Sequence, residues 1–271
     1  MAMIAKLSVK TALREGKTYL KESYFSPPFK IADITEDKQA GPLHLMLMSS
    51  SPGVLDGDEL QIQLELSEKT TLFLHTQSYQ RVFTMNNGAC QTMKVFMESG
   101  ASLTYLPSPV VPYENAIFVA GNQIYLRKNC HLVWGEILTC GRKLNGEIFR
   151  FSKYRNVTEI FLNGQLIIRE NLLLQPRLID PSGMGQMEGF THQASLIMLD
   201  EKLNTALLTE QIVAFLSSFH DLIFGVTEAH ENGIMLRILG NKAEQLHDCL
   251  KKIAGWHSLP ELNLKQNADA S

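Results

Sequence analysis

The sequence predicts a mainly β protein: a β-helix-like stack of strands with two α-helices in the C-terminal third. Three observations support this. Apolar and polar residues alternate from Leu43 to about Leu174, a strand–turn–strand unit recurs about every 30 residues, and helical apolar stripes begin only after residue 200. We expect one domain over residues 1–271, with a β body at about 1–200, a helix–strand–strand–helix region at about 201–257 and a frayed tail at 258–271.

The alternation is clearest in ELQIQLELS, which starts at Glu59. Leu60, Ile62, Leu64 and Leu66 fall on one face of a strand, and the polar residues between them fall on the other. No stretch of this region carries a sustained helical stripe, and the strands are too closely spaced for βαβ crossovers.

Three segments align without gaps: LELSEKTTLFL from Leu64, VFMESGASLTY from Val95 and IYLRKNCHLVW from Ile124. Their ninth position is always leucine, and their seventh is always small: Thr70, Ala101, Cys130. Stacked layers would place equivalent residues above one another, with the small column allowing close approach of the backbones. The alternative is that any strand–turn–strand looks like this.

The later elements follow from local signals. Asn163-Gly164 between two apolar strands predicts a type I′ hairpin, and residues 176–190 form a loop rich in proline, glycine and methionine. We expect a helix at about 204–220, then two strands, then a helix from Asn241 with Asn241 and Glu244 as a capping box.

The composition argues against several classes of protein. The 271 residues carry a net charge of −3, which gives no general attraction to nucleic acid or to an anionic membrane. No apolar run reaches the ~20 residues of a membrane helix, and the start lacks the pattern of a secretory signal, so we expect a cytoplasmic protein. The four cysteines have no zinc-ligand spacing and are expected to be buried apolar residues.

No catalytic motif is present. The sequence lacks a phosphate-binding glycine loop and a GxSxG nucleophile turn, and its histidines are scattered singly. DGDE at 56–59 could offer carboxylates to a cation, but a calcium loop would need a glutamate where Ser67 stands. A glycine turn leading into the next strand is the favoured interpretation.

A proline-rich stretch, YLPSPVVPYENA, covers residues 105–116. Its prolines cannot donate to a β-ladder, so the segment should be extended and rigid. It fits either a binding ridge or an ordinary stiff connection.

Taken together, the unusual stretches resemble one family, the urease accessory proteins called UreD, or UreH in some bacteria. The resemblance lies in the order FSPPFKI, SSPGVLDGDELQIQLEL, TQSYQRV, YLPSPVVPYENA, GEILTCGR, GEIFRF and GFTHQASL, from about Tyr24 to Leu196. Many relatives have a second glycine where this chain has Val54, a departure similar to the UreH-named branch. The residues that match the family motifs are Pro52, Gly53, Gly57, Asp58, Gly135, Glu136, Gly141 and Arg142.

The resemblance implies a largely β stack with two helices and a role without catalysis. Such proteins bind a second accessory protein, UreF, and through it the GTPase UreG, and the assembly docks on apo-urease to help install nickel. It also implies a dimer of UreF–UreH pairs, no tightly bound cofactor, and nickel as an ion in transit.

For the motif acids we state two alternatives. Asp58 and Glu136 either face a water-filled channel for nickel, or are buried structural acids paired with backbone amides or with Arg142. Oxygen ligands would favour passage, because nickel prefers imidazole and thiolate donors. Candidate partner-binding residues are Pro109, Pro112, Tyr113, Met184, Met187 and Phe190.

Two other classes of function remain open from the residues alone. One is a hydrolase with a dispersed site on a β-solenoid, which would need paired carboxylates at a distance that a sequence does not give. The other is a β-rich adhesion or capsid-like structural protein, against which the missing secretory signal argues.

Overall fold

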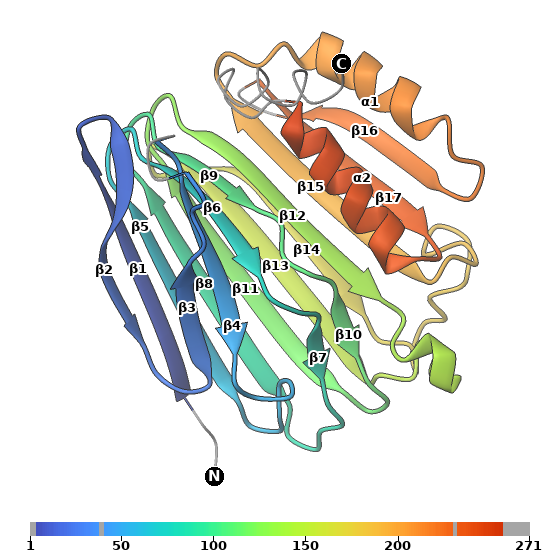
Figure 1. Cartoon of the computed structure of the whole chain (residues 1–271). Helices are drawn as coiled ribbons and strands as arrows, with labels where there is room; N and C mark the ends of the chain where they lie inside the picture. The colour runs from blue at the N-terminus through green and yellow to red at the C-terminus, as the bar shows by residue number, and fades with distance from the viewer. Residues whose placement is uncertain (1–3, 38–40, 230–231, 257–271) are drawn as a thin grey trace.

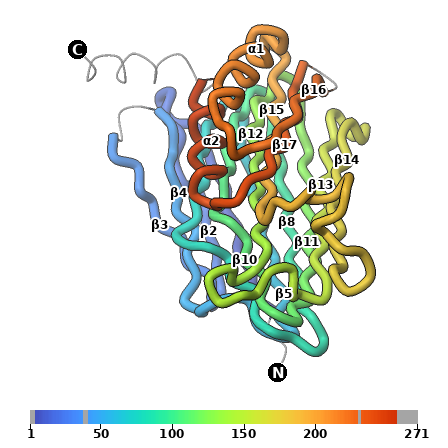
Figure 2. Tube along the Cα trace, turned by 90° about the vertical axis from the view of Figure 1, so that its right-hand side faces the viewer, coloured from blue at the N-terminus to red at the C-terminus, as the bar shows by residue number. Residues whose placement is uncertain are grey.

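Two β-sheets face each other, and two helices cover the outer face of one of them (Figures 1 and 2). The computed structural model describes residues 4–37, 41–229 and 232–256. The expected tail at 258–271 lies outside the described residues. The prediction of a mainly β fold with two helices in the C-terminal third is confirmed, whereas the description as a β-helix stays a prediction.

The first sheet, here sheet A, has seven strands in the order β14-β13-β11-β8-β5-β1-β2. All neighbours between β1 and β13 are parallel, and an antiparallel strand closes each edge. Its strands are β1 (Ile4–Arg14), β2 (Lys17–Phe25), β5 (Glu59–Leu66), β8 (Ala89–Met97), β11 (Ile117–Leu126), β13 (Lys153–Leu162) and β14 (Gln165–Leu174). Sequence reasoning assigned no strand to residues 4–33, where β1, β2 and β3 lie.

The second sheet, sheet B, follows the order β16-β17-β15-β12-β9-β6-β4-β3, and the short strands β7 and β10 pair beside β12. Its central strands from β4 to β12 are parallel. The strands are β3 (Phe29–Asp33), β4 (Leu43–Ser49), β6 (Thr71–Thr76), β7 (Gln80–Val82), β9 (Ser102–Tyr105), β10 (Val110–Pro112), β12 (His131–Thr139), β15 (His192–Asp200), β16 (Ile223–Ala229) and β17 (Gly233–Gly240).

Between β5 and β13 the chain alternates between the two sheets, and the predicted register is present. Leu64 pairs with Val95 and Val95 with Ile124 in sheet A, which is the first column of the aligned repeats. The ninth column forms the matching ladder in sheet B: Leu72, Leu103, Leu132. Cys130 of the small column is buried, as a packing residue should be.

Two apolar cores result from this layering. The larger lies between the sheets, and the smaller lies between sheet B and the helices. β15 shows both at once, because Ile197 and Leu199 join the first core while Leu196 and Met198 join the second. A strand covered on both faces is expected to be apolar along its length, and β15 is buried at every position except its last.

The helices are α1 (Thr205–Leu216) and α2 (Ala243–Gly255), and a short 3-10 helix, η1, spans Lys143–Asn145. Asn204 caps α1 by accepting from the Leu207 backbone N–H. The capping box predicted at Asn241 is wrong: α2 begins later, with Lys242 as its N-cap, and the Asn241 side chain accepts a bond from Thr191 instead. The Asn241 side chain therefore does not cap the helix, because it is bound by a residue that is distant in the sequence.

The hairpin turn predicted at Asn163-Gly164 is present. Asn163 and Gly164 both have positive φ, as a type I′ turn requires, and they join β13 to β14. Neither helix in the described ranges has the length and apolar character needed to cross a membrane.

Candidate functional site

The stretch SSPGVLDGDEL folds as a tightly packed loop before β5. Val54 forms an isolated bridge with Val82 of β7, and its N–H donates to the Arg81 carbonyl at 2.8 Å. Gly53 is required there, because an added Cβ would lie 2.5 Å from the Arg81 carbonyl oxygen and 2.6 Å from the Phe83 ring. The loop is thereby fixed against β7.

The two aspartates of this loop bind backbone amides. Asp56 Oδ1 accepts from the N–H groups of Asn87 and Gly88, both at 2.9 Å, and Asp58 Oδ2 accepts from the Leu55 N–H at 2.8 Å. Between them, Gly57 takes a positive φ of 82°, which suits glycine in a tight turn. The turn interpretation of this stretch therefore accounts for both carboxylates. Within the described residues no cluster of three or more acids, histidines and cysteines is placed to hold a metal ion.

The GEI motif lies in the middle of β12, where its residues alternate between the two faces of sheet B. Gly135 faces outward, and a Cβ there would lie 2.5 Å from Leu106 and 3.3 Å from Leu250 of α2. Glu136 faces inward, toward sheet A. The glycine thus lets helix α2 approach the strand that carries the glutamate.

Four donors surround the Glu136 carboxylate. Trp134 Nε1, Thr158 Oγ1 and Asn122 Nδ2 donate to Oε1 at 2.8, 2.8 and 3.2 Å, and Asn156 Nδ2 donates to Oε2. Three of these residues belong to sheet A, so the carboxylate reaches across the space between the sheets. Donors alone match the ionised form of a carboxylate, which only accepts hydrogen bonds.

Burial acts against that ionised form. It raises the pKa of Glu136, and the bonds from Trp134, Asn156 and Thr158 offset only part of the effect. No ion pair joins Glu136 to a basic residue in the part of the chain that the structure describes. Glu136 is half-buried, and a carboxylate that is largely withdrawn from water is normally paired with a cation.

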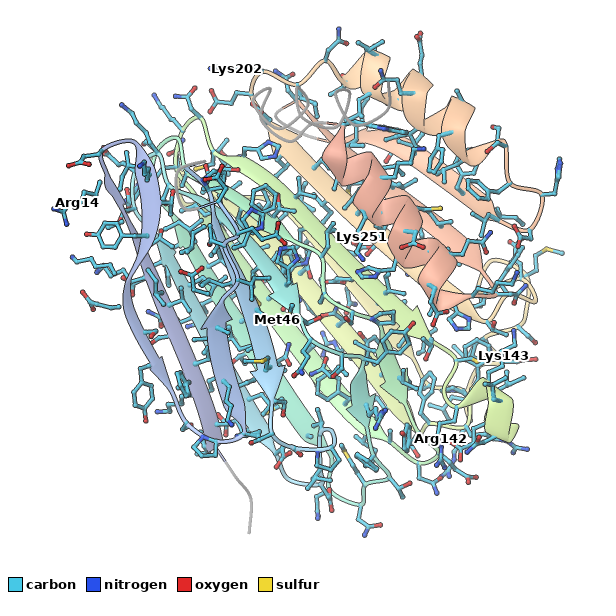
Figure 3. All side chains as sticks on the ribbon, in the orientation of Figure 1. Arg14, Met46, Arg142, Lys143, Lys202 and Lys251 are labelled. Atoms are coloured by element: carbon cyan, nitrogen blue, oxygen red, sulfur yellow. The ribbon has the colours of Figure 1, made fainter. Side chains whose placement is uncertain are left out.

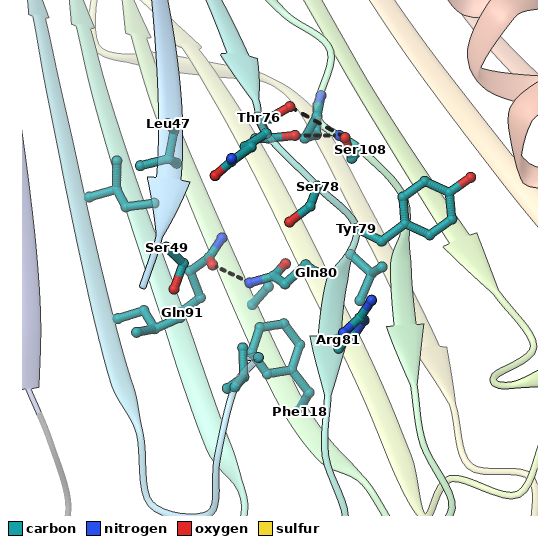
Figure 4. A pocket seen from close by; sticks show the side chains of 18 of the residues that line it. Leu47, Ser49, Thr76, Ser78, Tyr79, Gln80, Arg81, Gln91, Ser108 and Phe118 are labelled. Carbon is teal, nitrogen blue, oxygen red and sulfur yellow. Dashed lines mark hydrogen bonds between the residues drawn. The ribbon is translucent and has the colours of Figure 1, made fainter. Parts of the chain in front are cut away.

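Glu136 lines a partly open cavity of about 150 Å³. Figure 4 shows the part of this cavity that lies around Ser49, Gln80 and Gln91. Both Asp58 and Glu136 line it, together with amide and hydroxyl side chains: Ser49, Thr76, Gln80, Gln91, Ser108, Asn122 and Asn156. The rest of the lining is mainly apolar and includes Leu60, Val110 and Phe118. A cavity of this size has room for several water molecules. The structure therefore brings the two predicted acids to one cavity, where one oxygen of Asp58 is engaged by its own turn.

Arg142, the last residue of the GR motif, is not a partner of Glu136. Its guanidinium forms a two-contact ion pair with Glu147 and lies over the Tyr113 ring, 4.2 Å from the centroid (Figure 3 shows its place at the edge of the molecule). Glu147 also accepts from the Glu114 N–H at 3.2 Å. Gly141, with a φ of 118°, packs against the carbonyls of Pro112 and Glu147. The motif therefore binds the η1 loop to the proline-rich segment.

The candidate partner-binding residues differ widely in exposure. Pro109, Pro112 and Met187 are buried, Tyr113 and Phe190 are half-buried, and Met184 is 97% exposed. The proline-rich segment is therefore not a displayed ridge at Pro109 and Pro112; it forms β10, which pairs with β7 and touches β12. Whether any of these residues binds a partner stays a prediction.

Sequence reasoning did not identify the polar residues around Glu136. Asn122, Asn156 and Thr158 lie at inward positions of β11 and β13, among apolar residues such as Phe118 and Ile160. The sequence could have indicated them, because each is a polar residue at a position where the alternation of the strand predicts a buried apolar one. Gln80 and Gln91, which hydrogen-bond to each other at 2.8 Å, carry no comparable signal.

Comparison with known proteins gives a consistent result. A family model described as UreD urease accessory protein matches residues 3–269. A urease accessory protein UreD of Flavobacterium johnsoniae is 46% identical over 266 residues, covering 97% of this chain and 96% of that protein. Proteins of the same name from Acetivibrio thermocellus and Haemophilus influenzae are 36% and 35% identical, covering 92% and 93% of this chain and 95% and 97% of their own lengths.

Proposed function

Because this chain belongs to the UreD family of urease accessory proteins, we propose that it is a scaffold that binds UreF, and through UreF the GTPase UreG, on apo-urease. Family membership gives it a role in urease maturation, together with other maturation components, and makes it a non-catalytic protein. The hydrolase alternative is thereby removed. We also propose that the chain is a single domain, that it is located in the cytoplasm, and that it assembles as a dimer of UreF–UreH pairs.

Exposed apolar side chains support a docking role. Leu178, Ile179 and Met184, all in the loop between β14 and β15, are 75%, 63% and 97% exposed. Leu144 of η1 is fully exposed, and Lys143 beside it donates to Thr191 near the end of that loop. Apolar groups displayed in this way are typical of surfaces that another protein covers.

A pull-down tests the partners. Tagged chain should retain UreF from a mixture of purified proteins, and should retain UreG only when UreF is present. We also expect the chain expressed alone to be poorly soluble and to be rescued by co-expression with UreF. Retention of UreG in the absence of UreF would contradict the scaffold role. A chain that is monodisperse alone and does not bind UreF would contradict it as well.

We further propose that nickel, the cargo of the assembly, passes through the cavity that holds Glu136. The observation that carries this proposal is a half-buried carboxylate that lines a partly open cavity and has no ion pair with any described residue. A hydrated divalent cation would supply the missing positive charge. Carboxylate and amide oxygens bind nickel less strongly than imidazole or thiolate, so the ion would move on and not be trapped.

Activation of apo-urease by purified UreF, UreG, GTP, bicarbonate and nickel tests this route. Glu136→Gln removes the charge and keeps the shape, but its amide nitrogen cannot accept the bond from Asn156. We therefore expect activation to fall with UreF binding retained, and the urea unfolding midpoint to fall only by the loss of that one bond. Asp58→Asn is measured beside it as the second acid of the cavity, because its amide oxygen can still accept from the Leu55 N–H and any fall in activation then reports the lost charge. Unchanged activation by the Glu136 variant would remove it from the route, and a joint loss of UreF binding and stability would favour a purely structural acid.

A further inference from the structure

The segment 77–81, here called the strap, consists of the link from β6 to β7 and the first two residues of β7, and it lines the cavity along its whole length. Its ends are fixed by backbone bonds: the Gln77 N–H donates to the Leu47 carbonyl, and the Gln80 N–H donates to the Pro109 carbonyl, both at 3.0 Å. Between these points lie Ser78 and Tyr79. The strap is thus an extended bridge anchored at both ends beside the space that contains Glu136.

Tyr79 points out of the cavity toward α2 (Figure 4). Its hydroxyl donates to Glu244 Oε1 in the first turn of the helix, at 2.8 Å. Burial, together with this bond, raises the pKa of Tyr79 to about 12, and the bond from Tyr79 lowers the pKa of Glu244. At neutral pH a protonated phenol therefore faces an ionised carboxylate, which is the stronger, charge-assisted kind of hydrogen bond.

Gln80, the next residue, points the opposite way. Its amide donates to Gln91 Oε1 of β8 at 2.8 Å, so the contact crosses from the edge of sheet B to sheet A. Successive side chains of an extended segment alternate in direction, which explains why two neighbours hold opposite sides. No other hydrogen bond of Ser78 or Tyr79 is found within the described ranges.

We propose that the strap is a gate to the cavity and that the Tyr79–Glu244 bond is its latch. Glu244, the acceptor of the latch, belongs to α2. Leu250 of the same helix packs over Gly135, which is the neighbour of Glu136 in β12. A displacement of the first turn of α2 breaks the latch and leaves the strap held at its ends and by Gln80. Access to the Glu136 carboxylate is then set by the position of a helix on the outer face of the molecule. This gate depends on the geometry of one chain and not on which ion or molecule enters.

The two tryptophans of the chain make the gate measurable. Trp134 lines the cavity and is 2% exposed, and the other is Trp256. In a Trp256→Phe background, which keeps an aromatic ring against Phe215, all tryptophan fluorescence comes from Trp134. Acrylamide quenching of that fluorescence then reports how often the cavity opens. We expect Tyr79→Phe to raise the quenching rate constant about fivefold, the change in equilibrium that one net hydrogen bond corresponds to.

Controls separate the latch from a general loss of structure. Tyr19→Phe, at an exposed tyrosine of β2, should leave quenching unchanged. Glu244→Ala should raise quenching as Tyr79→Phe does, and the double variant should add nothing further, because both changes remove one bond. Hydrogen exchange should remain unchanged in β11 and β13.

Three results would overturn the gate. The first is quenching in Tyr79→Phe equal to that in the Trp256→Phe parent. The second is additive effects of Tyr79→Phe and Glu244→Ala. The third is faster hydrogen exchange across both sheets, which would show that the variant unfolds globally.

Discussion

Glu136 of sheet B accepts a hydrogen bond from Asn156 of sheet A, across a gap that is otherwise filled mainly by leucine, isoleucine, valine and methionine. Asn122 and Thr158 join the same cluster, and Asn122 also donates to Asn156 and Thr158. A fully bonded polar cluster inside an apolar core tends to fix one arrangement of the surrounding strands. The cluster therefore both orients the carboxylate and fixes the two sheets relative to each other.

The raised pKa of Glu136 predicts a pH-dependent stability. The folded protein holds this proton more tightly than the unfolded chain, so the contribution of Glu136 to the free energy of unfolding is largest below its unfolded pKa and is lost as the pH rises through its folded pKa. A tenfold difference in proton affinity between the folded and unfolded states corresponds to about 1.4 kcal/mol. Urea unfolding from pH 4 upward should show that Glu136→Gln lacks this decline. A constant difference between variant and wild type across the range would contradict the prediction.

Asp58 should matter for folding. Asp58→Ala removes the acceptor of the Leu55 N–H in a nearly buried turn, which should cost about 1–3 kcal/mol of unfolding free energy. Asp58→Asn retains an acceptor oxygen and should lose much less. Urea denaturation followed by circular dichroism measures both. Equal losses in the two variants would show that the negative charge, and not the hydrogen bond, stabilises the turn.

Two motif glycines should differ in their tolerance of alanine. At Gly53 the new Cβ meets the Arg81 carbonyl oxygen, which is backbone, and overpacking of this kind costs about 1–3 kcal/mol. At Gly135 the nearest atom is the end of the Leu106 side chain, which can move aside. The unfolding midpoint should therefore fall further for Gly53→Ala than for Gly135→Ala. The reverse order would mean that α2 cannot shift on β12.

The two methionines of the 176–190 loop form a natural pair. Met187 is 1% exposed, so Met187→Ala should cost about 2–5 kcal/mol of stability. Met184 is almost wholly exposed, so Met184→Ala should change stability by no more than about 0.5 kcal/mol. If this loop binds UreF, Met184→Ala should weaken the complex in a titration without affecting folding. An unaltered affinity would exclude Met184 from the interface.

The register of the strands was predictable because it follows from chain periodicity. The gap-free alignment of three segments gave the ladders Leu64–Val95–Ile124 and Leu72–Leu103–Leu132, since equivalent positions of a repeated strand–turn–strand unit stack directly. The N-terminal strands gave no repeat and were not assigned. The capping box at Asn241 failed because Thr191, 50 residues away, binds that side chain.

The order of residues by itself determined the mainly β character, the two late helices, the turn at 56–58 and membership of the UreD family, because each depends on local pattern or on motifs read along the chain. Only the tertiary structure decided that Glu136 is surrounded by Asn122, Asn156, Thr158 and Trp134, that Arg142 pairs with Glu147, and that Tyr79 binds Glu244. Arg142 and Glu147 are only five residues apart, but no local pattern marked them as a pair. The bonds to Glu136 from Asn122, Asn156 and Thr158 join separate strands, and the bond from Tyr79 to Glu244 joins residues 165 positions apart. Their partners are selected by how the sheets and the helix pack, and packing distances are not encoded in any one segment.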